Sequence, residues 1–591
     1  MALAPIAATR HPNAQDFFNP AHMSRVYQRH VRRSDVARPA ALWLCLSAFA
    51  LAACADSADK STGKGGGTMI IASTTEPQTL FPPRASNAQD FEVIASVFDR
   101  LAEIGPGLDA AGDSTFAPRL ATGWTWAKDS LSIAFALDPR IHWHDGAPLR
   151  AADVQFTFHA YTSPVVASEM RSLLGNIDSV TSRDSLTSVF WFKRRTPQQF
   201  MDATYSMFIL PSHLLASIPD SSLVNAPFGR APIGTGRFRF ARWESKSRLE
   251  IVSDTANARG AAKLDRVIWT FLGDAGAAAV KLAAGEADFL FNLRTEDVAP
   301  LAASPQLRLE RSTPLIYGFV GFNLRTRRAN GPTGTPHPVF GDSRVRRALA
   351  MAVDRAKMVR SVLDSAGTVS LGPAPRALIP DTAALTQLPF DLVAAKRLLD
   401  SAGWTDTKGD GVRKHNGVPL AFELLVPSTS PTRIKLSILL QAAFKDVGAN
   451  VTLQNMDGSA LGPRLEAGDF DAWMGGSAAN PGLQGLRQSW ASRGASNSQR
   501  YASTVFDAAL DSALTTFDAR RARGYWARAL QAAIDDAPSI WLYEERKPIA
   551  VHKRIRMTPM RADEWYANLA DWSVDPTQRI DRDRIAARGA R

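Results

Sequence analysis

The stretch "IHWHDGAPLRAADVQFTFHAY", Ile141 to Tyr161, places three histidines and two aspartates within 21 residues. Asp145-Gly146 is a pair typical of turns, and an apolar helical pattern begins near Asp153. A carboxylate in the first turn of a helix offsets the helix dipole. The stretch therefore predicts a strand, a tight turn and a helix with Asp153 at its start.

A metal site is the alternative explanation of the same residues. It would need His142 and His144 on one strand face and His159 from the helix. Two of these three positions easily face solvent. The structural explanation accounts for both aspartates without a metal, so no metal ligand is predicted.

The rest of the chain mixes strand and helix patterns. Its 591 residues are 45% hydrophobic and 21% charged, typical of a folded protein with more than one domain. Segment 131–137 alternates apolar and small residues like a half-buried strand, and 342–363 has helical spacing behind Asp342 or Ser343. Strands interleaved with helices predict an α/β fold.

The N-terminal part reads as a secretion signal. Ala40 to Ala53 is apolar, follows several arginines and is too short to span a bilayer. We predict a signal peptide over 1–53, with Met23 as an alternative start. The end of this segment, Leu-Ala-Ala-Cys, resembles the bacterial lipobox, which predicts lipidation at Cys54.

Residues 54–68 are small, polar and Gly-rich, which predicts a lipidated cysteine followed by a flexible tether. Cys45 leaves with the signal peptide, so the mature chain can form no disulfide. Without residues 1–53 the chain has 63 basic and 55 acidic residues and no run of five like charges. This balance does not predict nucleic-acid binding.

Two motif-like segments lack what their chemistry needs. Gly234–Phe238 has the spacing of a dinucleotide loop but leads into a strand pattern, so no helix N-terminus would face a phosphate. Asp406–Gly411 imitates a calcium loop but has Lys408 at a ligand position. No cofactor is predicted.

A series of short motifs, taken in order, resembles one family. Within the opening stretch, Trp143, Asp145-Gly146, Asp153 and Phe156 match its Trp-x-Asp-Gly-x-Pro-x-x-Ala-x-Asp-Val-x-Phe pattern. Further matches lie at 68–83, 116–137, 232–244, 280–289, 321–326, 338–355, 398–425 and 535–545. The mature chain thus resembles the family 5 extracellular solute-binding proteins of peptide-type (dipeptide and oligopeptide) ATP-binding-cassette (ABC) importers.

The resemblance implies a large two-lobed fold of the periplasmic-binding-protein type (type II) with a subdomain inserted in the first lobe. We expect lobe 1 over 69–310 with the insertion at about 96–229, lobe 2 over 311–520, and a return to lobe 1 over 521–591. A ligand would lie between the lobes.

The resemblance also implies a ligand site: the loop after the first strand, the strand end near Asn323, and the loop Trp473–Asn480. The predicted ligand-binding residues are Thr75, Glu76, Asn323, Trp473, Ser477, Ala479 and Asn480.

The loop departs from the family pattern. Peptide-binding members carry Gly-Trp-x-x-Asp, whose carboxylate pairs with the α-ammonium of the peptide, whereas this sequence has Gly476 and Ala479 at the Trp and Asp positions. Either Glu76 has taken over that charge, or the loop aligns a few residues differently. If the alignment holds, the loop leaves room for a bulkier or less cationic group.

Three functions remain open at this point. The first is a lipid-anchored, monomeric, extracytoplasmic protein that binds a peptide or peptide-like solute and delivers it to an ABC permease. The second is the same scaffold with a metal chelate, sugar, opine or quaternary amine as ligand. The third, an exported enzyme, lacks a convergent nucleophile and base.

Overall fold

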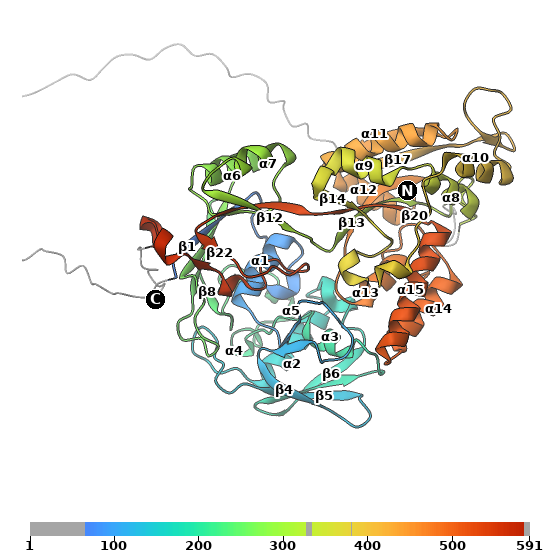
Figure 1. The fold of residues 1–591 in the computed structure, drawn as a ribbon. Helices are drawn as coiled ribbons and strands as arrows, with labels where there is room; N and C mark the ends of the chain where they lie inside the picture. Colours follow the sequence, from blue (N-terminus) through green and yellow to red (C-terminus); the bar gives the residue numbers. More distant parts are fainter. Residues whose placement is uncertain (1–65, 327–333, 380, 584–591) are drawn as a thin grey trace, which may run out of the picture. The chain divides into compact units, whose positions relative to one another are not determined.

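A computed structural model describes residues 66–326, 334–379 and 381–583 (Figure 1). The signal peptide, Met23, Cys54 and most of the tether lie outside these residues. The described chain is built on two large sheets and one smaller sheet.

The first sheet has seven strands. Strand β1 reads Thr-Met-Ile-Ile-Ala-Ser and is buried along nearly its whole length, as expected of a central strand covered on both faces. It pairs in parallel with its neighbours β10 and β11, whereas the other pairs are antiparallel. The strands, in spatial order, are β12 (Leu307–Ser312), β21 (Lys547–His552), β11 (Phe289–Leu290), β1 (Thr68–Ser73), β10 (Arg266–Phe271), β9 (Arg248–Ser253) and β8 (Phe238–Glu244). The helices of this part are α1 (Ala88–Val97), α6 (Ala275–Ala283) and α7 (Thr295–Ala302).

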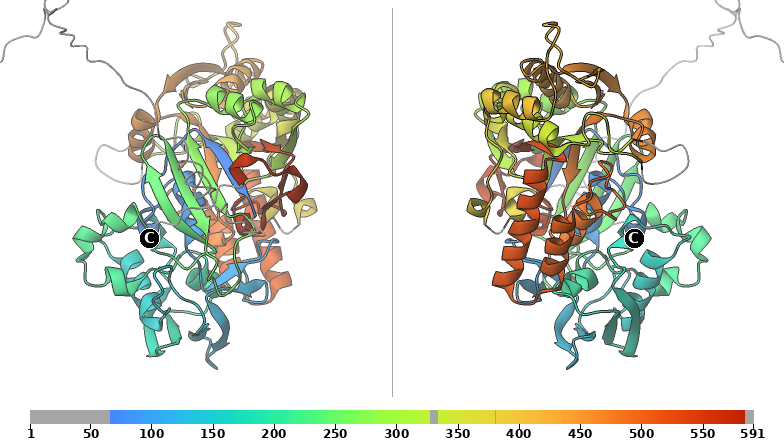
Figure 2. Two further views of the ribbon diagram at one scale, coloured as in Figure 1. Left: turned by 90° about the vertical axis from the view of Figure 1, so that its left-hand side faces the viewer. Right: turned by 90° about the vertical axis from the view of Figure 1, so that its right-hand side faces the viewer.

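The second sheet has six strands and a core on each face. Because side chains alternate along a strand, Phe319 and Val320 pack into different cores. The strands, in order, are β14 (Gly367–Val369), β20 (Ser539–Glu545), β13 (Ile316–Phe322), β19 (Ala472–Ala478), β17 (Ala421–Pro427) and β18 (Asn450–Met456). Its helices are α8 (Ser343–Met351), α9 (Arg355–Leu363), α10 (Leu392–Ser401), α11 (Pro431–Lys445), α12 (Gly458–Ala467), α13 (Leu483–Trp490), α14 (Thr504–Thr515) and α15 (Ala519–Asp536). Helices α14 and α15 lie side by side (Figure 2).

The third sheet is antiparallel and has its own core, which contains Ile133, Phe135 and Trp143. It lies within the chain interval expected for the inserted subdomain. Its strands, in order, are β4 (Ala121–Trp126), β5 (Ser132–Leu137), β7 (Thr187–Phe192) and β6 (Ile177–Asp184). Its helices are α2 (Ala151–Thr162), α3 (Gln199–Thr204), α4 (Ser212–Leu215) and α5 (Asp220–Leu223). Three short pairs complete the strands: β2 (Ala102–Ile104) with β3 (Phe116–Pro118), β15 (Lys414–His415) with β16 (Val418–Pro419), and β22 (Ile555–Arg556) with β23 (Ser573–Val574).

The opening stretch of the sequence forms a tight turn and then α2. Its first part makes only an isolated bridge, His142 to Pro148, in place of the expected strand. Gly146 has a φ of +89°, which favours glycine. Asp153 is 2% exposed and accepts from the backbone N–H of Arg150 at 2.8 Å, as expected at a helix start.

Segment 342–363 also forms its expected helical face, but as two helices. Asp342 caps α8, and Asp354 begins α9 by accepting from the N–H of Lys357 at 3.0 Å. The second cap starts a new helix within the continuous apolar pattern.

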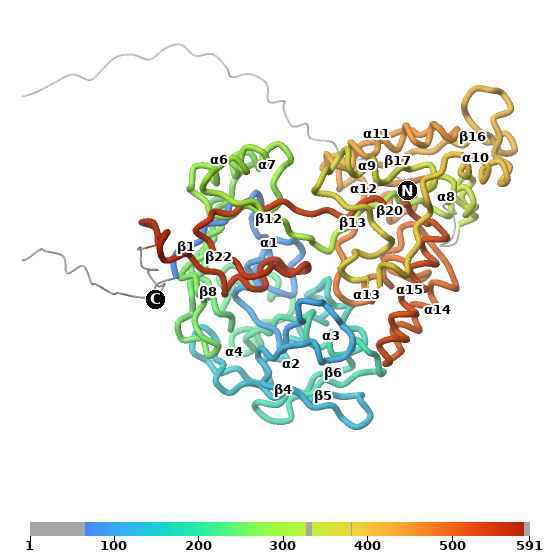
Figure 3. The backbone as a smooth tube through the Cα atoms, viewed as in Figure 1, coloured from blue at the N-terminus to red at the C-terminus, as the bar shows by residue number. Residues whose placement is uncertain are grey.

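The chain crosses between the two large sheets twice, and the crossings are neighbours (Figure 3). Strand β12 of the first sheet leads into β13 of the second, and β20 leads back into β21. Because β12 pairs with β21 and β13 with β20, the two connections run antiparallel. Such a paired crossing is suited to act as a hinge.

These crossings correct two expected lobe boundaries. Residues 521–546 do not return to the first lobe, because β20 pairs with β13 and β14 in the second sheet. The first lobe also extends beyond residue 310 to the end of β12 at Ser312. A strand pattern shows that a strand exists but not which sheet it joins.

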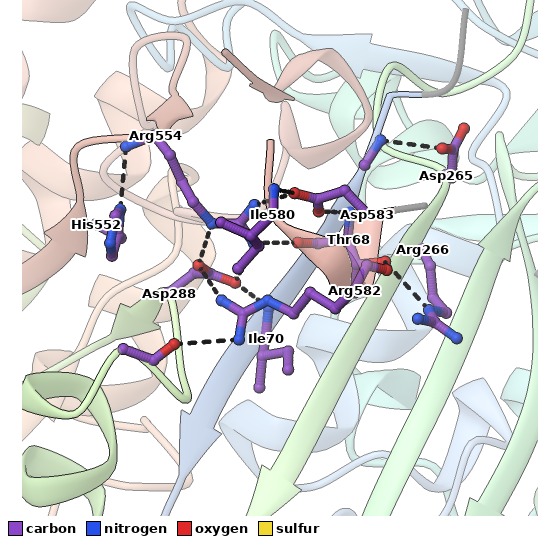
Figure 4. Close-up of polar contacts among 12 residues, drawn as sticks. Thr68, Ile70, Asp265, Arg266, Asp288, His552, Arg554, Ile580, Arg582 and Asp583 are labelled. Atoms are coloured by element: carbon purple, nitrogen blue, oxygen red, sulfur yellow. Dashed lines mark hydrogen bonds and ion pairs between the residues drawn. The ribbon is translucent and has the colours of Figure 1, made fainter. Parts of the chain in front are cut away.

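The C-terminal segment is tied to the start of β1 by a buried ionic cluster (Figure 4). The guanidinium of Arg554 contacts Asp288 at 2.7 Å and Asp583 at 2.6 Å, and these three side chains are 0–1% exposed. Asp288 also accepts from Arg582 at 2.6 Å and from the N–H of Ile70 at 2.8 Å. The cluster joins four distant segments of the first lobe.

Candidate functional site

A cavity of about 770 Å³ lies between the two large sheets. Both sheets contribute to its walls, and its lining includes residues 71–75, 290–294, 314–316 and 478–480. Sites that enclose small organic molecules have volumes of roughly 300–1,000 Å³. The cavity is therefore large enough to enclose a solute.

The cavity lies at the carboxyl ends of parallel strands. Strand β1 ends at Ser73, and Thr74 and Thr75 follow directly in the cavity wall. In open α/β sheets, ligands bind beyond the carboxyl ends of parallel strands, where loops diverge to either side. The cavity also touches the link between β12 and β13, so movement at the crossings would change its shape.

A buried polar network supports one wall. Ser73 Oγ lies 2.7 Å from Gln89 Oε1, and Gln89 Nε2 donates to Glu92 at 2.8 Å. The indole N–H groups of Trp269 and Trp565 also donate to Glu92, each at 3.2 Å. Burial raises the pKa of Glu92 to about 7, although the three donors act to lower it. The cavity thus has a carboxyl group in its wall that titrates near neutral pH.

Aromatic side chains form a second wall. Trp565 stacks on Phe289 and Phe291 with ring centroids 4.7 Å and 5.7 Å apart. Tyr566 packs edge-on against Trp565 at 5.6 Å. Aromatic surfaces with a few polar groups are typical of solute-binding cavities.

The charged groups at the cavity edge have partners. Arg294 donates to both oxygens of Asp297 at 2.7 and 2.8 Å. Asp563 accepts from Arg561 at 2.9 Å and from the hydroxyl of Tyr205 at 3.0 Å. A bound solute would therefore meet paired charges at these two positions.

Three of the predicted ligand-binding residues line the cavity: Thr75, Ala479 and Asn480. The N–H of Ala479 donates to the carbonyl of Leu315 at 2.7 Å, which attaches the loop after β19 to the link between β12 and β13. In the alignment expected from the sequence, Ala479 takes the position of the family's acid, and this residue brings a methyl group and no carboxylate to the cavity wall.

Glu76 lies outside the cavity lining. Its carboxylate accepts from the indole of Trp243, the hydroxyl of Ser245 and the N–H of Lys246, each at 2.8 Å. These donors belong to the β8–β9 hairpin, and Arg230 adds a cation 3.9 Å away. The structure therefore contradicts the expectation that Glu76 replaces the missing acid.

Asn323, Trp473 and Ser477 also lie outside the cavity lining. Asn323 is 1% exposed and donates to the carbonyls of Gly468 and Phe470 at 3.1 and 2.8 Å. Trp473 packs edge-on against Phe319 in the second sheet, and Ser477 lies opposite Tyr317 on β13. All three serve the packing of the second lobe.

Arg433 occupies the space beside Gly476, where the sequence predicted room. A side chain there would meet Nη2 of Arg433, only 2.0 Å from an ideal Cβ. Arg433 comes from α11, and in the alignment expected from the sequence it occupies the place of the family's aromatic ring. Of these two residues, Ala479 lines the cavity and Gly476 does not.

The three histidines of the opening stretch have separate partners. His142 Nδ1 lies 2.8 Å from the carbonyl of Arg140, His144 contacts the backbone of Gly234 and Gly236, and His159 lies 3.1 Å from Asp220. Within residues 66–326, 334–379 and 381–583, no three His, Cys, Asp or Glu side chains are grouped for a metal ion.

Sequence reasoning missed Gln89, Glu92, Trp565 and Tyr566. Glu92 lies on α1, and nothing in its local sequence sets it apart. The adjacent aromatics at 565–566, in a segment without a clear helix or strand pattern, are the signal that could have indicated a binding wall.

Two lobes that enclose a cavity beside paired crossings define a two-lobed solute-binding protein. The profile of the bacterial extracellular solute-binding proteins, family 5, matches residues 115–497. The chain belongs to this family, which confirms the resemblance seen in the sequence and the two-lobed α/β fold expected from it.

Curated relatives agree with this assignment. The oligopeptide-binding protein AppA of Bacillus subtilis is 27% identical over 73% of this chain and 79% of its own. Heme-binding protein A of Haemophilus influenzae is 24% identical over 80% and 88% of the two chains.

Solved structures show the same fold. AppA of Bacillus subtilis in complex with a nonapeptide matches with a TM-score of 0.71 and 24% identity, over 86% of this chain and 99% of that one. NikZ of Campylobacter jejuni in complex with Ni(L-His) matches with a TM-score of 0.71 and 23% identity, over the same shares.

Proposed function

We propose that this protein binds a peptide or peptide-like solute in the cavity between its lobes and delivers it to an ABC import permease. The observation that carries the proposal is the cavity of about 770 Å³ with an aromatic wall at the paired crossings. The name of its relative AppA supports peptides as the ligand class. Closure of the lobes would produce the form that a permease recognises.

A non-peptide solute is the second candidate. The absence of a carboxylate at Ala479 favours it, because a buried ammonium without a counter-charge is costly. The relative named heme-binding protein A and the structure of NikZ in complex with Ni(L-His) support a non-peptide ligand as an alternative. Metal chelates, sugars, opines and quaternary amines stay in this class. Since its relatives are solute-binding proteins, an exported enzyme is the least supported function.

Native mass spectrometry of protein purified without added ligand tests the proposal. We expect a retained small molecule of peptide mass that is released unchanged, and a change in tryptophan fluorescence when it rebinds, since 13 of the 14 tryptophans lie beyond the predicted signal peptide. Chemical conversion of the retained molecule, or an empty cavity that responds to no peptide, would contradict it.

An acid introduced at residue 479 tests whether the site lacks a carboxylate that would bind the α-ammonium of a peptide. We expect Ala479→Asp to raise the affinity for free di- or tripeptides about tenfold or more, because a carboxylate would face the α-ammonium of the peptide. Titration by calorimetry measures the effect, and Ala479→Asn is the matched uncharged control. If wild type already binds free peptides and acetylation of their N-termini abolishes binding, another group holds the ammonium.

We further propose that the mature protein begins at a lipidated Cys54 and acts as a monomer outside the cytoplasm. The lipobox-like sequence and the Gly-rich tether support the anchor. No helix in the described part of the chain is long and apolar enough to cross a bilayer. We expect Cys54→Ala to move the protein from the membrane fraction to the soluble fraction. An N-terminus at another residue without acyl mass would refute the anchor.

A further inference from the structure

A second cavity of about 180 Å³ adjoins the main one. Phe91, Asn480, Asp563 and Tyr566 line both cavities, so the two are neighbours across a shared wall. An engineered cavity of about 150 Å³ in another protein holds benzene, so this one has room for one side group of a larger solute.

The second cavity lies where the inserted subdomain meets the second lobe. The N–H of Leu483 at the start of α13 donates to Gln198 Oε1, just before α3, at 3.1 Å. Gly482 packs against Met201, with the sulfur 3.1 Å from an ideal Cβ. A group bound here would therefore contact both lobes.

Asp202 is the unusual residue of this cavity. It lies on α3 and is only 7% exposed. No described residue donates a hydrogen bond to its carboxylate or forms an ion pair with it, and the attraction of Arg194 acts from beyond ion-pair range. Burial raises the pKa of Asp202 to about 7. A buried carboxylate without a partner is costly and uncommon in folded proteins.

The other charged groups of the cavity are engaged elsewhere and form no ion pair with Asp202. Arg100 is 4% exposed and donates to Glu564 at 2.6 Å, while its guanidinium lies over the ring of Phe208. Asp563 is held by Arg561 at 2.9 Å. Asp202 is thus the acid in either cavity that lacks a partner within the described residues.

The remaining walls define what could reach Asp202. Met170, Leu173 and Met201 supply apolar surface, including two flexible thioethers. An apolar stem that ends in a hydrogen-bond donor or a cation would satisfy both the walls and the carboxylate.

We propose that this cavity is a specificity subsite in which Asp202 binds an amine, amidine or guanidine group at the end of a short apolar stem of the ligand. The proposal rests on the proposed function, since the rest of the solute would occupy the main cavity. The loop at Ala479 offers no carboxylate for a cation. A cationic group of the ligand would instead be bound in the second cavity, by Asp202 of the inserted subdomain.

A pair of small probes tests the subsite without knowledge of the whole ligand. In saturation-transfer NMR, n-butylammonium should bind the purified full-length protein with a dissociation constant on the order of millimolar, and n-butanol at least tenfold more weakly. Asp202→Asn should weaken the amine about tenfold to hundredfold and change n-butanol less than about twofold. Asp178→Asn, at an exposed position on β6 of the same subdomain, is the matched control and should change neither.

Two further results would overturn the proposal. One is equal binding of n-butylammonium by wild type and Asp202→Asn. The other is a lower melting temperature of Asp202→Asn with the amine preference intact, which would assign the carboxylate a purely structural role.

A series of tripeptides distinguishes a failure of the proposed subsite from a failure of the proposed peptide-binding function. Lysine and norleucine are compared at each position, because they share a stem and differ in the cation. Peptide binding without a preference for lysine would refute the subsite and leave the peptide function standing. Amine-selective probe binding without any peptide binding would support the subsite and refute the peptide function.

Discussion

Replacing Arg554 with leucine is expected to lower the free energy of unfolding by about 3–5 kcal/mol. The side chain of Arg554 is 1% exposed and donates to the side chains of Asp288 and Asp583, which are both 0% exposed, and to the carbonyl of Thr68 at 2.6 Å. Its removal leaves two buried carboxylates short of a cation, which costs more than the loss of packing. Urea denaturation followed by tryptophan fluorescence measures the change.

Arg556→Leu is the matched control for this prediction. Arg556 lies two residues further along the chain and forms an ion pair with Asp575 at 2.7 Å, but its side chain is 63% exposed. An exposed pair contributes about 0–1 kcal/mol. Similar losses in both variants would show that the buried cluster does not hold the C-terminal segment to β1.

The second large effect is a pH dependence that originates at Glu92. Its pKa of about 7 in the folded state lies above the ordinary value of 4.5 because the side chain is buried. The protonated form therefore stabilises the fold fully below about pH 4.5, and this stabilisation is lost as the pH rises through about 7. The loss amounts to about 2–3 kcal/mol between about pH 5 and about pH 8.

The comparison of wild type with Glu92→Gln isolates this effect from other titrating groups. The variant cannot lose a proton at this position, so its unfolding free energy minus that of wild type should increase by about 2–3 kcal/mol over that pH range. Denaturation series at several pH values measure the difference. A difference independent of pH would mean that Glu92 is already charged at pH 5, held by Gln89, Trp269 and Trp565.

Glu92 also matters for the cavity, because it lies in the wall and binds the indole of Trp565. A change of its charge acts directly on the aromatic surface that a solute would contact. Its donors come from residues 177 and 473 positions away in the chain, and from Gln89 on the same helix. No local pattern in the sequence predicts such a meeting.

Features that depend on neighbours in the chain could be predicted well. Asp153 at the start of α2, Asp342 as the cap of α8 and the turn at Gly146 each follow from the backbone needs of a few consecutive residues. The order of such local motifs along the chain also indicated the family and its two-lobed fold, which the family match over 115–497 confirmed.

The sequence by itself determined the α/β class, the local caps and turns, and the absence of an acid at residue 479. Only the tertiary structure decided which side chains face the cavity, since this depends on partners distant in the chain. Thr75 lines the cavity while its neighbour Glu76 turns to the β8–β9 hairpin. Arg433 from α11 fills the space above Gly476, and β20 joins the second sheet by pairing with β13. Each outcome is set by long-range packing and hydrogen bonding, which no spacing of residues along the chain encodes.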